Sequence, residues 1–526
     1  MGKKILFTDA VIHTGRTETE TAASMLVENG RIVSLDPEDA RGARTVSLGG
    51  KHVYPCLIDG HIHLLSTIVL AAQGFEVCRI ENGGIAPDTL GGVEKRLRGF
   101  AASKPKNSVV VGNNYIITAI REHRLPNRQE LDEWCGGRAV AVYTIDGHAS
   151  ALSTAMLRKI GIEPEGHDGV LTGEAHDRVQ GRLTDAIAAS VTLSVLARGI
   201  ANFQNKCAEY GISCVGALDG NGDSEKDFTT KLLVFLAKHF DIDVRLYYQY
   251  WNIDKALPLT KSQNRRRIGG CGDWEMDGAS GAHSAAFSLP YRDTGTTAEC
   301  YYTQEDVDRT VARADAEGFQ IACHAIGDKA VDRIVKALRG TSGKVRHRIE
   351  HCEFASDAAI EEIASRGYAV MAQPGYSWID KRFLHTYERY LPDELIARLK
   401  FRTLLEKGIC LCGSSDSPVQ DIDPWQQMLG MTEFYREEES VSAYQAFRCY
   451  TANAAEALLE GDNRGMLLPG MRADFFTGDR DLFALTPNEI CAFRPCGTYY
   501  SGRPAKRRNG TAAGLFAMIL KNHKKV

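Results

Sequence analysis

Two histidines, His61 and His63, follow directly on the apolar run of residues 53–58. Successive side chains along a β-strand point to opposite faces, so positions i and i+2 project to the same side. On a helix the same two positions diverge and could not bind one ion together. The pair therefore predicts the C-terminal end of a strand that presents half of a metal site.

The middle of the chain alternates β-rich runs with amphipathic helical patterns. Further candidate strands cover residues 212–218, 244–248, 269–276, 319–324, 345–351, 368–373 and 409–415. Apolar residues at three- and four-residue spacing predict helices over residues 307–317, 330–338, 358–366 and 394–406. With the strand that ends at His63, the strand count is eight. This count predicts an α/β fold, a TIM-type (β/α)8 barrel of parallel strands.

Residues 66–205 separate the first two of these strands and are far longer than a usual crossover. They carry strand signals of their own at 109–111 and 139–143, and helical patterns near 88–102 and 178–198. We expect an inserted subdomain after strand 1. Insertions at the C-terminal end of a barrel strand lie at the catalytic face, so this one is expected to help cover the site.

Both ends of the chain have the pattern of short antiparallel strands. The N-terminal signals lie at residues 5–12 and 24–33, where Asn29-Gly30 favours a tight hairpin turn. The C-terminal signals lie at residues 473–476, 492–493 and 498–502. We predict one small β-sandwich domain built from residues 1–56 and 455–526, with residues 57–454 forming the barrel domain.

Composition narrows the function classes. A formal net charge of −4 argues against a nucleic-acid binder, which usually has a strongly basic face. No run approaches the roughly 18 apolar residues of a membrane helix. Fourteen cysteines without CxxC spacing indicate reduced core residues of a cytoplasmic protein. The expected partner is a small-molecule substrate, with no nucleic acid and no membrane; self-association as a homo-oligomer is left open.

Three further candidates stand at the ends of predicted strands: His324, His351 and Asp416. A barrel gathers its active-site side chains at these ends. Neutral imidazole and carboxylate suit Zn²⁺ and related divalent ions, and bound zinc lowers the pKa of its water from about 15.7 to about 7. A carboxylate such as Asp416 can accept the proton of that water and pass it to a leaving group. The set predicts metal-assisted hydrolysis.

An ordered series of motifs over nearly the whole chain resembles the amidohydrolase superfamily, and within it the YtcJ-like branch that includes N-substituted formamide deformylases. The motifs are Asp59-Gly60-His61-Ile62-His63, Asp146-Gly147-His148, Asp277-Gly278-Ala279, His324-Ala325-Ile326-Gly327-Asp328, Ile349-Glu350-His351, Gln373-Pro374, Ser415-Asp416-Ser417-Pro418, Tyr450-Thr451-Ala452-Asn453-Ala454 and Gly470-Met471-Arg472-Ala473-Asp474. The resemblance implies a metal-bearing (β/α)8 barrel with a terminal β-sandwich. It implies that one metal is bound by His61 and His63, a second by His324 and His351, that Asp416 is a metal-linked general base and acid, and that His148 faces the substrate.

The chain departs from this family at one position. The family usually has a carboxylated lysine four residues before the Asp-Gly pair, and Asp273 stands there instead. On a regular strand Asp273 and Glu275 share one face, about 6.6 Å apart. Asp273 is too short to reach the bridging point, so we predict Glu275 as the metal ligand, with Asp273 as the second choice. Either acid could instead be solvated or paired with an arginine, and the site could hold one ion or two.

These observations favour a metal-dependent hydrolase, with zinc as the expected ion, that cleaves a C–N bond of an amide, formamide or cyclic amide. Two alternatives stay open. The same metal site could serve a dipeptidase, or a lactonase or esterase. The chain could also be a catalytically silent relative that acts as a binding protein, a reading to which the missing lysine lends weight.

Overall fold

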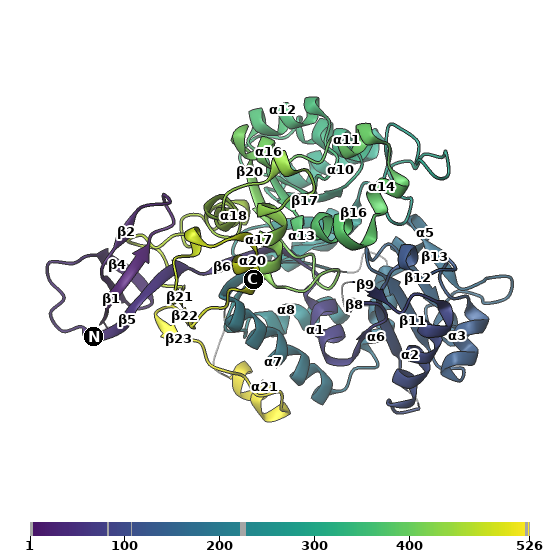
Figure 1. The fold of residues 1–526 in the computed structure, drawn as a ribbon, viewed down its shortest axis with the longest axis horizontal. Helices are drawn as coiled ribbons and strands as arrows, with labels where there is room; N and C mark the ends of the chain where they lie inside the picture. Colours follow the sequence, from purple (N-terminus) through teal and green to yellow (C-terminus); the bar gives the residue numbers. More distant parts are fainter. Residues whose placement is uncertain (1–3, 82–83, 107, 221–227, 521–523, 525–526) are drawn as a thin grey trace.

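Eight parallel strands form a barrel at the centre of the molecule (Figure 1). The computed structural model describes residues 4–81, 84–106, 108–220, 228–520 and 524. In chain order the barrel strands are β6 (Leu57–Ile62), β14 (Ile212–Asp219), β15 (Asp243–Tyr248), β16 (Arg267–Glu275), β17 (Gln320–Ala325), β18 (Arg348–His351), β19 (Ala369–Ala372) and β20 (Cys410–Gly413). Each pairs with its neighbours in chain order, so all eight predicted strands and the barrel fold are confirmed.

The barrel closes between β20 and β6 through the segment that follows β20. The backbone N–H of Asp416 donates to the carbonyl of His61 at 2.9 Å, and the N–H of His63 donates to the carbonyl of Ser417 at 2.7 Å. This closure is a single bridge instead of a continuous ladder. It brings Asp416 beside the two histidines at the end of β6.

Helices cover the outside of the barrel. The predicted helices near 307, 330 and 358 are confirmed as α10 (Gln304–Ala316), α11 (Asp328–Leu338) and α12 (Asp357–Arg366). The helix predicted over 394–406 is wrong in its continuity, because α15 (Asp393–Ile396) and α16 (Arg402–Glu406) are separate. The buried carboxylate of Glu439 accepts hydrogen bonds from the N–H groups of Phe401 and Thr403. These bonds cap the N-terminus of α16, so a new helix begins there. Further helices are α8 (Phe228–Ala237), α9 (Ile253–Ala256), α13 (Pro374–Ile379), α14 (Thr386–Tyr390), α17 (Pro424–Thr432), α18 (Ala443–Cys449) and α19 (Ala452–Ala457).

The segment between β6 and β14 has a sheet and a core of its own. Its sheet consists of β7 (Phe75–Glu76), β10 (Val110–Tyr115), β11 (Val140–Thr144), β12 (Ala149–Leu152) and β13 (Val170–Thr172), and its helices include α2 (Leu90–Ala102), α3 (Arg128–Cys135), α4 (Thr154–Lys159) and α5 (Glu174–Asp177). The helix expected near 178–198 is two helices, α6 (Gln180–Ala188) and α7 (Leu193–Tyr210), which meet at 112°. Helix α7 packs on α1 (Leu64–Gln73), beside the barrel.

The two ends of the chain join in one sheet, which lies on the side of the barrel away from the inserted sheet (Figure 1). It contains β1 (Lys4–His13), β2 (Thr21–Ala22), β3 (Met25–Glu28), β4 (Arg31–Leu35), β5 (Arg44–Pro55), β21 (Phe475–Gly478), β22 (Gly497–Tyr500) and β23 (Arg503–Pro504). The antiparallel pairing of β5 with β21 confirms that the termini pair. The strand predicted at 492–493 is wrong: α20 (Pro487–Ala492) runs there, started by a capping box of Thr486 and Glu489.

The helices of the described residues differ from membrane spans in length and composition, with one bent pair as the exception. No single helix there is long and apolar enough to cross a membrane, whereas α6 and α7 together, a bent pair, have that length and composition.

Candidate metal centre

The four histidines and Asp416 converge at one end of the barrel. His61 and His63 stand at the end of β6, His324 lies on β17, His351 ends β18, and Asp416 follows β20. All these strands are parallel, so their C-terminal ends meet on one face, where barrels carry their active sites. His61 and His324 are fully buried. The structure therefore brings together the five residues that the sequence grouped.

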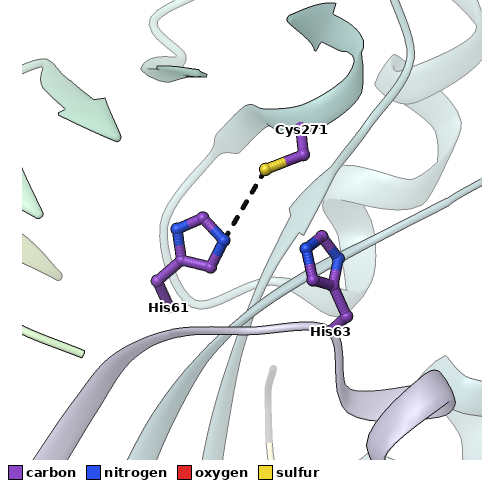
Figure 2. A group of neighbouring side chains, drawn as sticks. All are labelled: His61, His63 and Cys271. Carbon is purple, nitrogen blue, oxygen red and sulfur yellow. Dashed lines mark hydrogen bonds between the residues drawn. The ribbon is translucent and has the colours of Figure 1, made fainter. Parts of the chain in front are cut away.

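The histidines surround a thiol that the sequence interpretation did not include. The sulfur of Cys271, on β16, lies 3.6 Å from Nε2 of His61, 3.8 Å from Nδ1 of His324 and 3.9 Å from Nε2 of His351. Figure 2 shows the first of these contacts, with the rings of His61 and His63 next to each other below the sulfur. Cys271 forms one candidate ligand group with His61 and His63 and another with His324 and His351.

The outward nitrogen of each histidine is hydrogen-bonded to an oxygen. These pairs are His61 Nδ1 with Glu350 Oε2 at 2.8 Å, His63 Nδ1 with the Leu218 carbonyl at 3.1 Å, His351 Nδ1 with Gln373 Oε1 at 2.7 Å, and His324 Nε2 with the Gly278 carbonyl at 3.4 Å. An oxygen acceptor keeps the hydrogen on the outward nitrogen of a neutral ring. The lone pair of the other nitrogen then points at the common centre, as in metal-binding histidines.

The acceptor behind His61 is a buried ion pair. The Arg348 guanidinium donates to Glu350 from Nε at 2.5 Å and from Nη2 at 2.6 Å, and neither side chain is exposed. Burial by itself would raise the pKa of Glu350, but the Arg348 charge and the His61 hydrogen bond outweigh it and hold that pKa below its usual range. Glu350 therefore stays a carboxylate and orients His61.

Asp416 contributes an oxygen to the same centre. Its Oδ1 lies 3.1 Å from Nε2 of His61 and 3.2 Å from Nε2 of His63. Two ligands at about 2.0–2.1 Å from one tetrahedral zinc ion lie about 3.3 Å apart, so these spacings fit a shared ion. Burial would raise the pKa of Asp416, but His61 and His63 hold it well below the usual range. Its backbone has φ 55°, a strained conformation of the kind that occurs at functional sites.

The two acids considered for the bridge lie to one side of the thiol. Glu275 is buried, its Oε1 accepts from the Gly272 N–H at 2.9 Å, and its Oε2 has no hydrogen-bond partner among the described residues. It belongs to a candidate ligand group with His148 and His324. Asp273 accepts from the Trp251 N–H at 3.1 Å. A ligand role for Glu275, with Asp273 second, stays a prediction.

A bulge in β16 lies where Cys271 enters the metal centre. Gly270 pairs with Cys323 and Glu275 pairs with His324, so the residues between Gly270 and Glu275 bulge out of the ladder. Gly269 and Gly270 have φ of 101° and 116°, and a Cβ at Gly269 would lie 1.9 Å from the Ala322 carbonyl oxygen. Regular alternation therefore does not hold here. Glycines around a cysteine inside a strand, as in Gly269-Gly270-Cys271-Gly272, were the signal of a bulge.

His148 reaches the centre from the insertion. It lies between β11 and β12, and its Nδ1 is 3.2 Å from the Asp177 carboxylate. The Tyr301 hydroxyl donates to the same carboxylate at 2.9 Å. The His148 ring lies 5.2 Å from that of His324, centroid to centroid. Burial would lower the pKa of His148, but Asp177 raises it well above the usual value.

Two cavities meet at the metal centre, and His148, His351 and Asp416 line both. The larger has a volume of about 200 Å³ and the smaller about 90 Å³. Apolar side chains of the larger cavity include Leu65, Val69, Ile187 and Leu233. Those of the smaller cavity include Ile326, Leu399, Phe401, Leu404 and Phe434. Small organic ligands bind in such apolar cavities with a few convergent polar groups.

Comparison with known proteins gives a consistent family assignment. A profile of the amidohydrolase family matches residues 44–505. The chain is 23% identical to YtcJ of Bacillus subtilis (strain 168), over 93% of this chain and 96% of that protein. It is 25% identical to an N-substituted formamide deformylase of Arthrobacter pascens, over 97% of this chain and 99% of that protein. Its fold matches that of an uncharacterized metal-dependent hydrolase from Pyrococcus furiosus with a TM-score of 0.70 and 22% identity, covering 91% of this chain and 100% of that chain.

Proposed function

The chain belongs to the amidohydrolase family, and from that premise we propose that it is a metal-dependent hydrolase that cleaves a C–N bond of a small amide, formamide or cyclic amide. One observation carries the proposal. The outward nitrogens of His61, His63, His324 and His351 are all hydrogen-bonded to oxygens, while inward nitrogens converge on Cys271. Structural stability alone gives no reason for that orientation.

The donor set fits a divalent ion, and we propose zinc, which imidazole, carboxylate and thiolate ligands suit. A bound zinc ion supplies hydroxide at neutral pH and polarises the carbonyl of the substrate. Asp416 Oδ1 faces His61 and His63. Its other oxygen is the proposed acceptor for the proton of the attacking water, which it then donates to the leaving nitrogen.

The two cavities support a substrate that extends to both sides of the scissile bond. His148 lies at their junction with its Nδ1 fixed by Asp177, so its Nε2 edge is the proposed contact for the substrate. We also propose a cytoplasmic location, in which the fourteen free cysteines would stay reduced.

Hydrolysis of a substrate panel by the zinc-loaded protein tests the function. We expect turnover of N-formyl or N-acyl amines, lost in His61→Ala and after chelation, and restored to the wild type by zinc. Faster turnover of dipeptides or of lactones and esters would contradict the C–N assignment in favour of a dipeptidase or a lactonase. Full metal occupancy without turnover of any panel member would point to a catalytically silent binding protein.

A further inference from the structure

We propose that the sulfur of Cys271 bridges two metal ions, one bound also by His61, His63 and Asp416, the other by His324 and His351. This inference rests on the proposed metal-dependent function and assigns the ligand that joins the two halves of its site. Cys271 is the residue shared by the two histidine pairs among the candidate ligand groups of the described residues.

The distances are those of ligands on a common ion. With bonds of about 2.3 Å to sulfur and about 2.0–2.1 Å to nitrogen, two ligands of a tetrahedral zinc ion lie about 3.6 Å apart. The sulfur of Cys271 lies 3.6 Å from the His61 nitrogen, and 3.8 and 3.9 Å from those of His324 and His351. These three spacings match ligands of a common ion, and His63 belongs with the sulfur and His61 to one candidate ligand group.

Hydrogen bonds alone explain fewer of the contacts around the Cys271 sulfur than two bound metal ions do. A thiol has one hydrogen and can donate one hydrogen bond, yet three imidazole nitrogens lie around this sulfur. The outward hydrogen bonds of the three histidines turn bare nitrogens toward it. Two ions bound to a deprotonated sulfur satisfy all the contacts at once, and binding releases the thiol proton to water.

Glu275 is placed less well than Cys271 to bridge the two ions. Its candidate ligand group contains His324 and His148, but neither His61 nor His63. One of its oxygens is occupied by the Gly272 N–H. A thiolate bridge adds to the selectivity of the four imidazoles: soft ligands favour zinc, cobalt and cadmium over magnesium and manganese, so the site should select thiophilic ions.

Cobalt spectroscopy on the full-length chain tests the bridge without an activity assay. Metal-free wild type titrated with cobalt(II) should develop a thiolate-to-cobalt charge-transfer band in the near ultraviolet, which stops growing at two ions per chain. Cys271→Ser should lose the band and bind cobalt more than about 100-fold more weakly, beyond the effect of residues that only support a ligand. Cys323→Ser is the matched control, because its buried thiol on β17 faces the Trp274 carbonyl, and it should keep the band.

Three outcomes would overturn the bridge: a band that survives in Cys271→Ser, wild type that binds cobalt without a band, or a band that stops growing at one ion per chain. If Cys271→Ser does not fold, X-ray absorption at the zinc edge of the wild type decides. We expect a sulfur atom at about 2.3 Å from zinc, and its absence would contradict the bridge. The proposed function is tested separately from the bridge. A thiolate band without hydrolysis of any substrate supports the bridge and refutes the hydrolase. Hydrolysis without the band supports the hydrolase and refutes the bridge.

Discussion

The buried pair of Arg348 and Glu350 gives a quantitative prediction for the support of His61. Glu350→Gln keeps the shape but leaves the Arg348 charge buried and without its counter-ion, because neither side chain is exposed. Loss of one partner of such a pair costs about 3–5 kcal/mol of unfolding free energy. Metal affinity should fall by about 10-fold, the low end for an outer-shell change, because glutamine retains an oxygen that can accept from His61.

Urea unfolding of the metal-free protein measures the first effect, and competition with a chelator measures the second. Glu362→Gln is the control, since Glu362 pairs with Arg339 and Arg366 in a solvated surface cluster, where about 0–1 kcal/mol is expected. If Glu350→Gln unfolds at the same urea concentration as the wild type and binds zinc equally well, the assigned role of Glu350 is wrong.

Three further predictions follow from individual contacts. Gly269→Ala should destabilise the protein by more than about 2 kcal/mol in urea, because its positive φ and its clash with a backbone carbonyl oppose a Cβ; equal stability would show that the bulge tolerates a Cβ. Asp177→Asn should lower kcat/KM by about 100-fold through misplacement of His148, with metal content unchanged in elemental analysis; metal loss would contradict a substrate role. Burial would raise the pKa of Glu460, but Arg245 lowers it to about 2, so its stabilisation is present above the unfolded-state pKa of about 4.3 and is lost as pH falls toward 2. The free energy of unfolding of Glu460→Gln should therefore vary less with pH over this acid range than that of the wild type. Equal pH dependence in the two proteins would contradict the prediction.

The strands of the barrel could be predicted because each is an apolar run that ends in polar residues. Residues 212–219 of β14 are all buried, although their sequence signal is brief. The convergence of His61, His324 and His351 followed from parallel topology alone, since strand ends of one barrel share a face. No side-chain geometry was needed for that step.

Two kinds of detail lay outside local patterns. The bulge of β16 depends on its register against β17, so spacing in the sequence did not show that Cys271, taken there as a core residue, lies among the histidines. The break before α16 depends on Glu439, which is far along the chain from the helix it starts. Both are set by contacts between elements, which spacing in the sequence does not encode.

The most direct test of the account is a crystal structure of the zinc-loaded protein with anomalous diffraction at the zinc edge. We predict two zinc peaks at the C-terminal end of the barrel, each about 2.3 Å from the sulfur of Cys271, with His61 and His63 on one ion and His324 and His351 on the other. A zinc-loaded crystal without anomalous density among these histidines would contradict the proposed metal centre.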